Sequence, residues 1–164
     1  MKQQNSSVSS PTNEIFIVHG HDEEMKQTVA RTLEALKLQP IILHEQSNQG
    51  ATIIEKFEKN ANVQFAIILL SPDDMAYKKT ESSEKAKPRA RQNVIFEFGY
   101  FIGKLSRAQV FVLKQDDKKD KLELPTDILG ITYTPYDSGD SWKLKLVQAL
   151  KATGYSVDAN NLPT

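Results

Sequence analysis

The chain alternates between short apolar runs and segments whose apolar residues recur every three or four positions. Five apolar runs predict β-strands at residues 14–20, 40–45, 63–71, 108–115 and 131–136. Helical spacing predicts helices at 22–38, 52–61, 91–103 and 138–154. Near-continuous apolar strands joined by helices are typical of a parallel sheet that is buried on both faces. Right-handed crossovers then favour an α/β, flavodoxin-like fold with a five-stranded sheet in the order 2-1-3-4-5.

Both ends of the chain and one internal segment lack this periodicity. Residues 1–13 are polar and rich in Ser, which predicts a disordered leader. Residues 156–164 predict a linker or tail, so residues 14–155 form the expected domain. Residues 72–90 are rich in Lys, Ser and Glu and predict a long loop that is either functional or disordered. A short helical turn is expected at 124–130.

Composition and charge exclude several kinds of function. The 164 residues contain no Cys, which excludes disulfides, thiolate catalysis and Cys-ligated zinc. Lys plus Arg and Asp plus Glu both number 21, and this balance argues against a general nucleic-acid binder. No His, Asp or Glu set has the spacing of a metal site, so no metal is expected. The absence of a long apolar run and of a secretory leader predicts a cytoplasmic protein without a membrane span.

Polar residues gather where the first three predicted strands end. Because the carboxyl ends of parallel strands meet at one edge of a sheet, these residues are expected to surround a small polar ligand. No GxGxxG or Walker-type motif is present, so a nucleotide would not bind in the Rossmann or P-loop manner. Asp22 and Asp73 are also suited to capping a helix or a turn, which leaves both roles open. The clusters are His19, Gly20, His21 and Asp22; His44, Glu45, Gln46, Asn48, Gln49 and Gly50; and Ser71, Pro72, Asp73 and Asp74.

One carboxylate interrupts the most apolar of the predicted helices. On a helical wheel Glu97 falls on a narrow polar strip with Asn93, Tyr100 and Lys104, between two apolar stripes. The pattern leaves two alternatives: Glu97 faces solvent, or it is held in a pocket because chemistry requires it. Gly99 costs the helix about 1 kcal/mol relative to Ala, which predicts close packing at that position.

Four separated motifs carry a family resemblance. FIVHGHD, HEQSNQGATIIEKFE, SPDD and RARQNVIFEFGYFIG occur in this order. Together they resemble the bacterial TIR-like nucleotide-binding domains of cyclic-nucleotide-triggered antiphage defence, including those fused to a bacterial STING domain. The resemblance covers about Ile15 to Gly154. It implies the flavodoxin-like fold and hydrolysis of NAD+ at the nicotinamide–ribose bond, with NAD+ as substrate and no cofactor.

The resemblance also implies roles for individual residues. Glu97 would be the catalytic residue, stabilising a transition state that resembles an oxocarbenium ion. The 46–52 loop would gate the pocket and mediate self-association, and a STING-like cyclic-nucleotide sensor, fused or recruited, would drive that assembly. Arg89 or Arg91 would hold the pyrophosphate. Further NAD+ contacts are expected from His19, Gly20, Asp22, Gln46, Asn48, Gln49, Gly50, Ser71, Asp73 and Asn93.

Other classes of protein share this topology. A nucleoside deoxyribosyltransferase-like enzyme would use the glutamate as a covalent nucleophile and leave NAD+ intact. A non-catalytic TIR adaptor would only self-associate, and Glu97 would be dispensable. A phosphorylation receiver domain fits less well, because it requires an Asp at the end of the third strand, where this chain has Ser71 and Pro72.

Overall fold

Five parallel strands form the centre of the molecule. The computed structural model describes residues 12–42, 51–128 and 130–163. The sheet has the order β2-β1-β3-β6-β7, and every neighbouring pair is parallel. This order confirms the predicted flavodoxin-like arrangement. The strands are β1 (Glu14–Val18), β2 (Gln39–Ile42), β3 (Ala66–Leu70), β6 (Val110–Lys114) and β7 (Thr134–Pro135).

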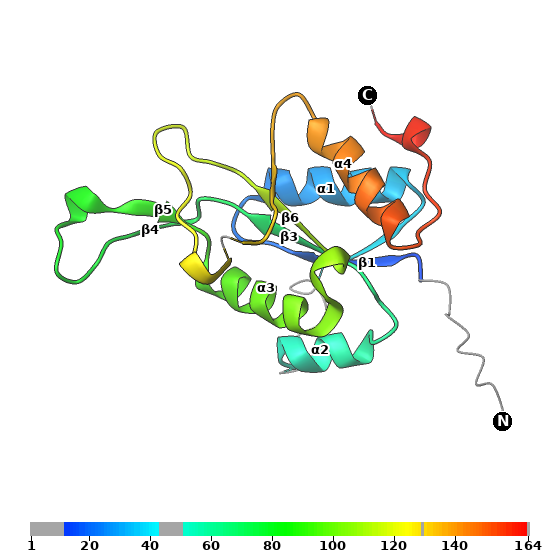
Figure 1. The fold of residues 1–164 in the computed structure, drawn as a ribbon, viewed down its shortest axis with the longest axis horizontal. Coiled ribbons are helices and arrows are strands. Elements are labelled where there is room, and N and C mark those ends of the chain that lie inside the picture. The colour runs from blue at the N-terminus through cyan, green and yellow to red at the C-terminus, as the bar shows by residue number, and fades with distance from the viewer. Residues whose placement is uncertain (1–11, 43–50, 129, 164) are drawn as a thin grey trace.

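Helices cover both faces of the sheet (Figure 1). Because successive side chains of a strand point to opposite faces, β1 contributes Ile15 and Ile17 to one core cluster and Phe16 and Val18 to the other. The first cluster lies under α1 (Glu23–Ala35) and α4 (Ser141–Ala152). The second lies under α3 (Gln92–Leu105), with α2 (Ile53–Lys59) packed beside it.

The first helix ends earlier than its periodicity predicts. It stops at Ala35 rather than near Leu38, because Lys37 adopts a left-handed conformation with φ of 64°. Pro40 lies beyond this turn, inside β2. The strand predicted at 40–45 is described only as far as Ile42, since residues 43–50 lie outside the described part of the chain.

Residues 74–89, here called the arm, form a hairpin within the long loop that was predicted at 72–90. β4 (Asp74–Ala76) pairs antiparallel with β5 (Lys87–Arg89), and a 3₁₀ turn at Ser83–Lys85 lies between them. Figure 1 shows the arm projecting from the body of the domain. Strands of three residues are too short to show a period-two pattern, which explains why sequence periodicity did not reveal them.

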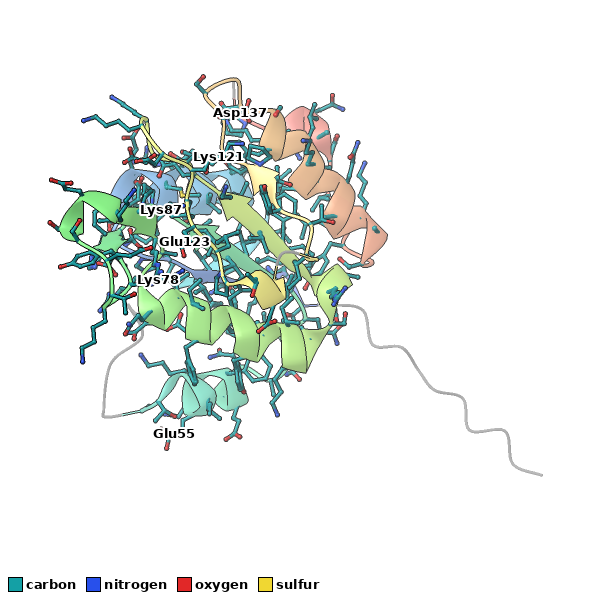
Figure 2. All side chains as sticks on the ribbon, turned by 60° about the vertical axis from the view of Figure 1, so that its left-hand side comes forward. Glu55, Lys78, Lys87, Lys121, Glu123 and Asp137 are labelled. Carbon is teal, nitrogen blue, oxygen red and sulfur yellow. The ribbon has the colours of Figure 1, made fainter. Side chains whose placement is uncertain are left out.

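The segment after β6 lies along the base of the arm. Glu123 forms a parallel bridge with Arg89, and its amide donates to the carbonyl of Pro88 at 2.8 Å. Figure 2 shows Lys78 and Lys87 of the arm on the same side of the molecule as Lys121 and Glu123. A 3₁₀ turn at Thr126–Ile128 confirms the helical turn predicted in this segment.

The C-terminal residues return to the domain. A 3₁₀ turn at Ala159–Asn161 follows α4, Val157 is buried, and Leu162 packs against the α1–α4 core cluster. As far as residue 163, the segment predicted to be a linker or tail therefore covers the domain surface. None of the helices in the described ranges is long and apolar enough to cross a membrane.

Gly99 does not occupy a tightly packed position. It is exposed on α3, and a Cβ atom built there would meet no heavy atom within 4 Å. The prediction of close packing at Gly99 is therefore wrong. No close contact with another segment compensates for the helix stability that this glycine costs.

Gly99→Ala is expected to raise the free energy of unfolding by about 0.5–1 kcal/mol, because alanine loses less conformational entropy in a helix. Urea denaturation of both proteins measures the difference. A fall in the free energy of unfolding would contradict the open space found around Gly99.

Candidate active site

A cleft lies where the carboxyl ends of β1, β3 and β6 meet. Its volume is about 770 Å³, and the predicted clusters after the first and third strands both line it. Two of its walls were not predicted: Met75 and Pro88 come from the arm, and Gln115–Asp120 follow β6. The charge run within 115–120 follows β6, which is adjacent to β3, and this position brings it to the same edge of the sheet.

The carboxylate of Asp73 connects the elements that surround the cleft. Its Oδ1 accepts hydrogen bonds from the His21 amide at 3.0 Å and the Ser71 hydroxyl at 2.6 Å. Its Oδ2 accepts from the Arg91 amide at 3.2 Å. A Cβ atom added to Gly20 would overlap this carboxylate. Asp73 thus contacts the end of β3, the turn after β1 and the start of α3.

Glu97 lies in the second turn of α3 and is only 4% exposed. The solvent-facing alternative is therefore wrong. Val94, Phe98 and Phe101 on the same helix are also buried, so apolar side chains flank the carboxylate. Acidic side chains are rarely buried to this degree, because removing a carboxylate from water is costly unless the protein holds it. Glu97 is not among the residues that line the cleft, so burial makes it a candidate for a functional role by its chemistry alone.

An aromatic cluster supports the α3 side of the domain. Phe16 of β1 contacts Phe57 of α2 and Phe101 of α3, with ring centroids at 5.5 and 5.2 Å. Tyr100 packs edge-on against Phe57 at 5.4 Å. Burial, with a smaller effect from the Glu58 carboxylate, raises the pKa of the Tyr100 phenol, so this group is neutral at physiological pH. The helix that carries Glu97 therefore rests on a rigid apolar base.

Comparison with known proteins places this chain in a family. Residues 14–138 match the family model described as CAP12/Pycsar effector protein, TIR domain. The chain belongs to this TIR-domain family. The protein tirC of Dictyostelium discoideum is 42% identical over 140 residues, which cover 79% of this chain and 69% of tirC.

Two further relatives are longer than this TIR domain. The uncharacterized protein YuaY of Escherichia coli (strain K12) is 45% identical over 148 residues, which are 90% of this chain and 48% of YuaY. The Pycsar effector protein PaPycTIR of Pseudomonas aeruginosa is 40% identical over 72 residues, 44% of this chain and 21% of that protein. The chain thus spans about half of YuaY and about a fifth of PaPycTIR.

Arg89 at the end of β5, Arg91 and Asn93 lie together around the start of α3. They line a second hollow of about 410 Å³ between α3 and the arm of the TIR domain. Arg89 forms an ion pair with Glu123 at 3.0 Å, in which both side chains remain about 40% exposed. Arg91 is the N-cap residue of α3. Asn93 precedes Glu97 by four positions, which places both on one side of the helix.

The remaining predicted contacts divide into two groups. The Nδ1 atom of His19 lies 2.8 Å from the carbonyl oxygen of Gly20 at the end of β1. Gln46, Asn48, Gln49 and Gly50, with the rest of the 46–52 loop before Ala51, lie outside the described residues. Across residues 12–42, 51–128 and 130–163, no group of three His, Asp or Glu side chains is arranged to hold a metal ion.

Asp22 lines the cleft and also caps α1. Its Oδ1 accepts a hydrogen bond from the Met25 amide at 2.8 Å. Asp22→Ala is expected to lower the free energy of unfolding by about 1 kcal/mol, and Asp22→Ser to restore most of it, because serine retains a capping oxygen. Urea denaturation checks both values. A serine variant as unstable as the alanine variant would contradict the capping role, whereas restored stability with a raised KM for NAD+ would reveal an additional ligand contact.

Proposed function

We propose that this TIR domain is an NAD+ hydrolase that cleaves the nicotinamide–ribose bond, with Glu97 as the catalytic residue. The observation that carries the proposal is the burial of Glu97, only 4% exposed, in the second turn of α3. A surface carboxylate on a helix requires no explanation, whereas buried ionisable groups are concentrated at functional sites.

The chemistry requires little more than one well-placed carboxylate. Nicotinamide is already cationic in NAD+, so it departs without a strong general acid. Positive charge then develops on the ribose, and a carboxylate beneath the ring stabilises it. Apolar walls exclude water and strengthen this attraction, because charges interact more strongly at low dielectric. Val94, Phe98 and Phe101 are the buried neighbours on α3 that supply such walls.

The hollow between α3 and the arm suits the pyrophosphate. Arg89, Arg91 and Asn93 line it. Guanidinium groups bind phosphate oxygens in a bidentate manner. Since the Arg89–Glu123 pair is partly exposed, the energy needed to separate it is small. In the proposal Arg91 is therefore the first pyrophosphate ligand, and Arg89 joins it when it leaves Glu123.

The proposal extends to regulation. The relatives PaPycTIR and CD-NTase-associated protein 12 of Lachnospiraceae bacterium (strain RUG226) are longer proteins, of which this chain matches 21% and 25%. We infer that a cyclic-nucleotide sensor clusters this TIR domain through surfaces that include the 46–52 loop. In one form of this hypothesis the sensor is a STING-like domain. NAD+ depletion by the clustered domain would then act in antiphage defence.

Product analysis separates this function from its rivals. The chain is incubated with NAD+, and in parallel with a deoxynucleoside and a free acceptor base. Nicotinamide and ADP-ribose, linear or cyclised, are the expected products of the first reaction, with no base exchange in the second. Base exchange with intact NAD+ would instead identify a deoxyribosyltransferase-like enzyme. Inactivity in both reactions, together with self-association, would identify an adaptor.

A further inference from the structure

We infer that Asp73 is a positioning residue, which fixes the start of α3 and therefore the location of Glu97, rather than a contact to NAD+. The inference concerns the site of the proposed function and rests on it for its catalytic consequence. Its structural part stands independently, because it concerns contacts that the chain makes with itself.

The two oxygens of Asp73 are already occupied by the protein. Three donors converge on them: the amides of His21 and Arg91 and the hydroxyl of Ser71. Hydrogen bonds to an ionised acceptor are stronger than neutral ones. His21 and Arg91 are far from Asp73 in sequence, and Ser71 is two residues before it. The carboxylate therefore joins segments that a local turn could not bring together. A ligand would have to compete with these bonds.

Asp73 also replaces a missing local cap. The side chain of Arg91, the N-cap residue of α3, makes no capping hydrogen bond, and the first turn of α3 contains no acidic residue. Helix N-termini leave amides without intrahelical partners and attract negative charge. Asp73 accepts the Arg91 amide from 18 residues away, so the start of this helix is set by a residue at the end of β3.

The same bond closes the neck of the arm. Asp74 and Arg89 form the innermost pair of the β4–β5 hairpin. Asp73 precedes Asp74, Arg91 lies two residues after Arg89, and the 3.2 Å hydrogen bond joins Asp73 to Arg91. The arm and the first turn of α3 therefore share this anchor, while the arm is also held by its contacts with Glu123.

Gly20 provides independent support for the position of the carboxylate. An added Cβ atom would overlap the Asp73 side chain, so the turn after β1 is shaped around it. Glu97 lies about 9 Å farther along the helix axis than Arg91, given the rise of an α-helix. A shift of the first turn would move Glu97 with it, since the intervening backbone is rigid.

Hydrogen exchange tests the structural part without any assay of activity. Asp73→Asn replaces one carboxylate oxygen by an NH2 group. This group cannot accept a hydrogen bond, so at least one of the three donors loses its partner. Hydrogen exchange in peptides that cover residues 90–96 is expected to accelerate by about 10-fold or more. This is the effect of losing one hydrogen bond to a charged group. Peptides from α4 should be unchanged. Uniform acceleration in both helices would show general destabilisation, and no change in either would refute the anchor.

A double-mutant cycle with Gly20 makes the result specific. Gly20→Ala should strongly destabilise the protein when Asp73 is present and have little effect when it is combined with Asp73→Ala, because the overlapping side chain is then gone. Thermal or urea unfolding of the four proteins gives the coupling. Additive effects would contradict the packing of Gly20 against the carboxylate.

Kinetics test the catalytic consequence. Asp73→Asn is expected to lower kcat for nicotinamide release by about 10- to 100-fold, the usual cost of a misplaced catalytic group, with KM within about two-fold. Asp127→Asn, an exposed carboxylate far along the chain, serves as the matched control. A raised KM with unchanged kcat would make Asp73 a ligand contact and overturn the inference. If the wild-type chain releases no nicotinamide, the proposed function fails, while exchange and the cycle still decide the role of Asp73.

Discussion

Glu97→Gln is expected to reduce nicotinamide release from NAD+ by about 10³-fold, the scale of losing one preorganised electrostatic group in an active site. Glutamine has the same shape but lacks the negative charge that stabilises the developing cation. Glutamine also keeps an acceptor oxygen and nearly the same volume, so the free energy of unfolding should change little. Loss of activity without loss of stability is the result that separates a catalytic role from a structural one.

The control for this experiment is Glu34→Gln. Glu34 is an exposed glutamate on α1, which covers the opposite face of the sheet. This variant should retain the activity and stability of the wild type. Equal activity of the Glu97 and Glu34 variants would remove Glu97 from the mechanism and favour the adaptor. A Glu97 variant that unfolds would indicate that the carboxylate serves the fold.

Phe16→Ala is expected to lower the free energy of unfolding by about 3–5 kcal/mol, the usual cost of removing a buried aromatic ring. Phe16 has 0% exposure and is the point at which β1, α2 and α3 meet, through its contacts with Phe57 and Phe101. For a protein of this size the change corresponds to a fall in Tm of roughly 6–20 °C. Calorimetry or circular dichroism measures it.

Phe96→Ala provides the comparison within the α3 side of the domain. Phe96 is 61% exposed, so its removal should change the free energy of unfolding by no more than about 0.5 kcal/mol. The two phenylalanines thus differ in burial rather than in chemistry. A similar loss in both variants would contradict the assignment of the aromatic cluster as the support of α3.

The buried elements of this fold are predictable from sequence because their patterns are strong. β3 and β6 are buried at every position, and near-continuous apolar runs of this kind appear directly in the sequence. Strand order follows from chain connectivity, since parallel strands with right-handed crossovers permit few arrangements. These two features were sufficient to predict the sheet and the edge at which the cleft lies.

Other features depend on contacts that no local pattern encodes. Helical spacing places Glu97 on a narrow strip between apolar stripes, but only packing against the rest of the domain decides whether such a strip is exposed or buried. In the sequence Asp73 is one of two adjacent aspartates. Its hydrogen-bond partner Arg91 is 18 residues away, on the other side of the arm in the sequence. At Gly99 the prediction was wrong. A glycine in a helix was taken to indicate a close neighbour, but a Cβ atom built there meets no heavy atom within 4 Å.

Nicotinamide release from NAD+ by the wild-type chain, fused to an oligomer that forces the domains together, tests the central claim most directly. The account predicts release that rises steeply with clustering and disappears in the clustered Glu97→Gln protein. Absence of release from the clustered wild-type protein, with the fold intact by circular dichroism, would contradict the hydrolase and direct attention to self-association as the function of the domain.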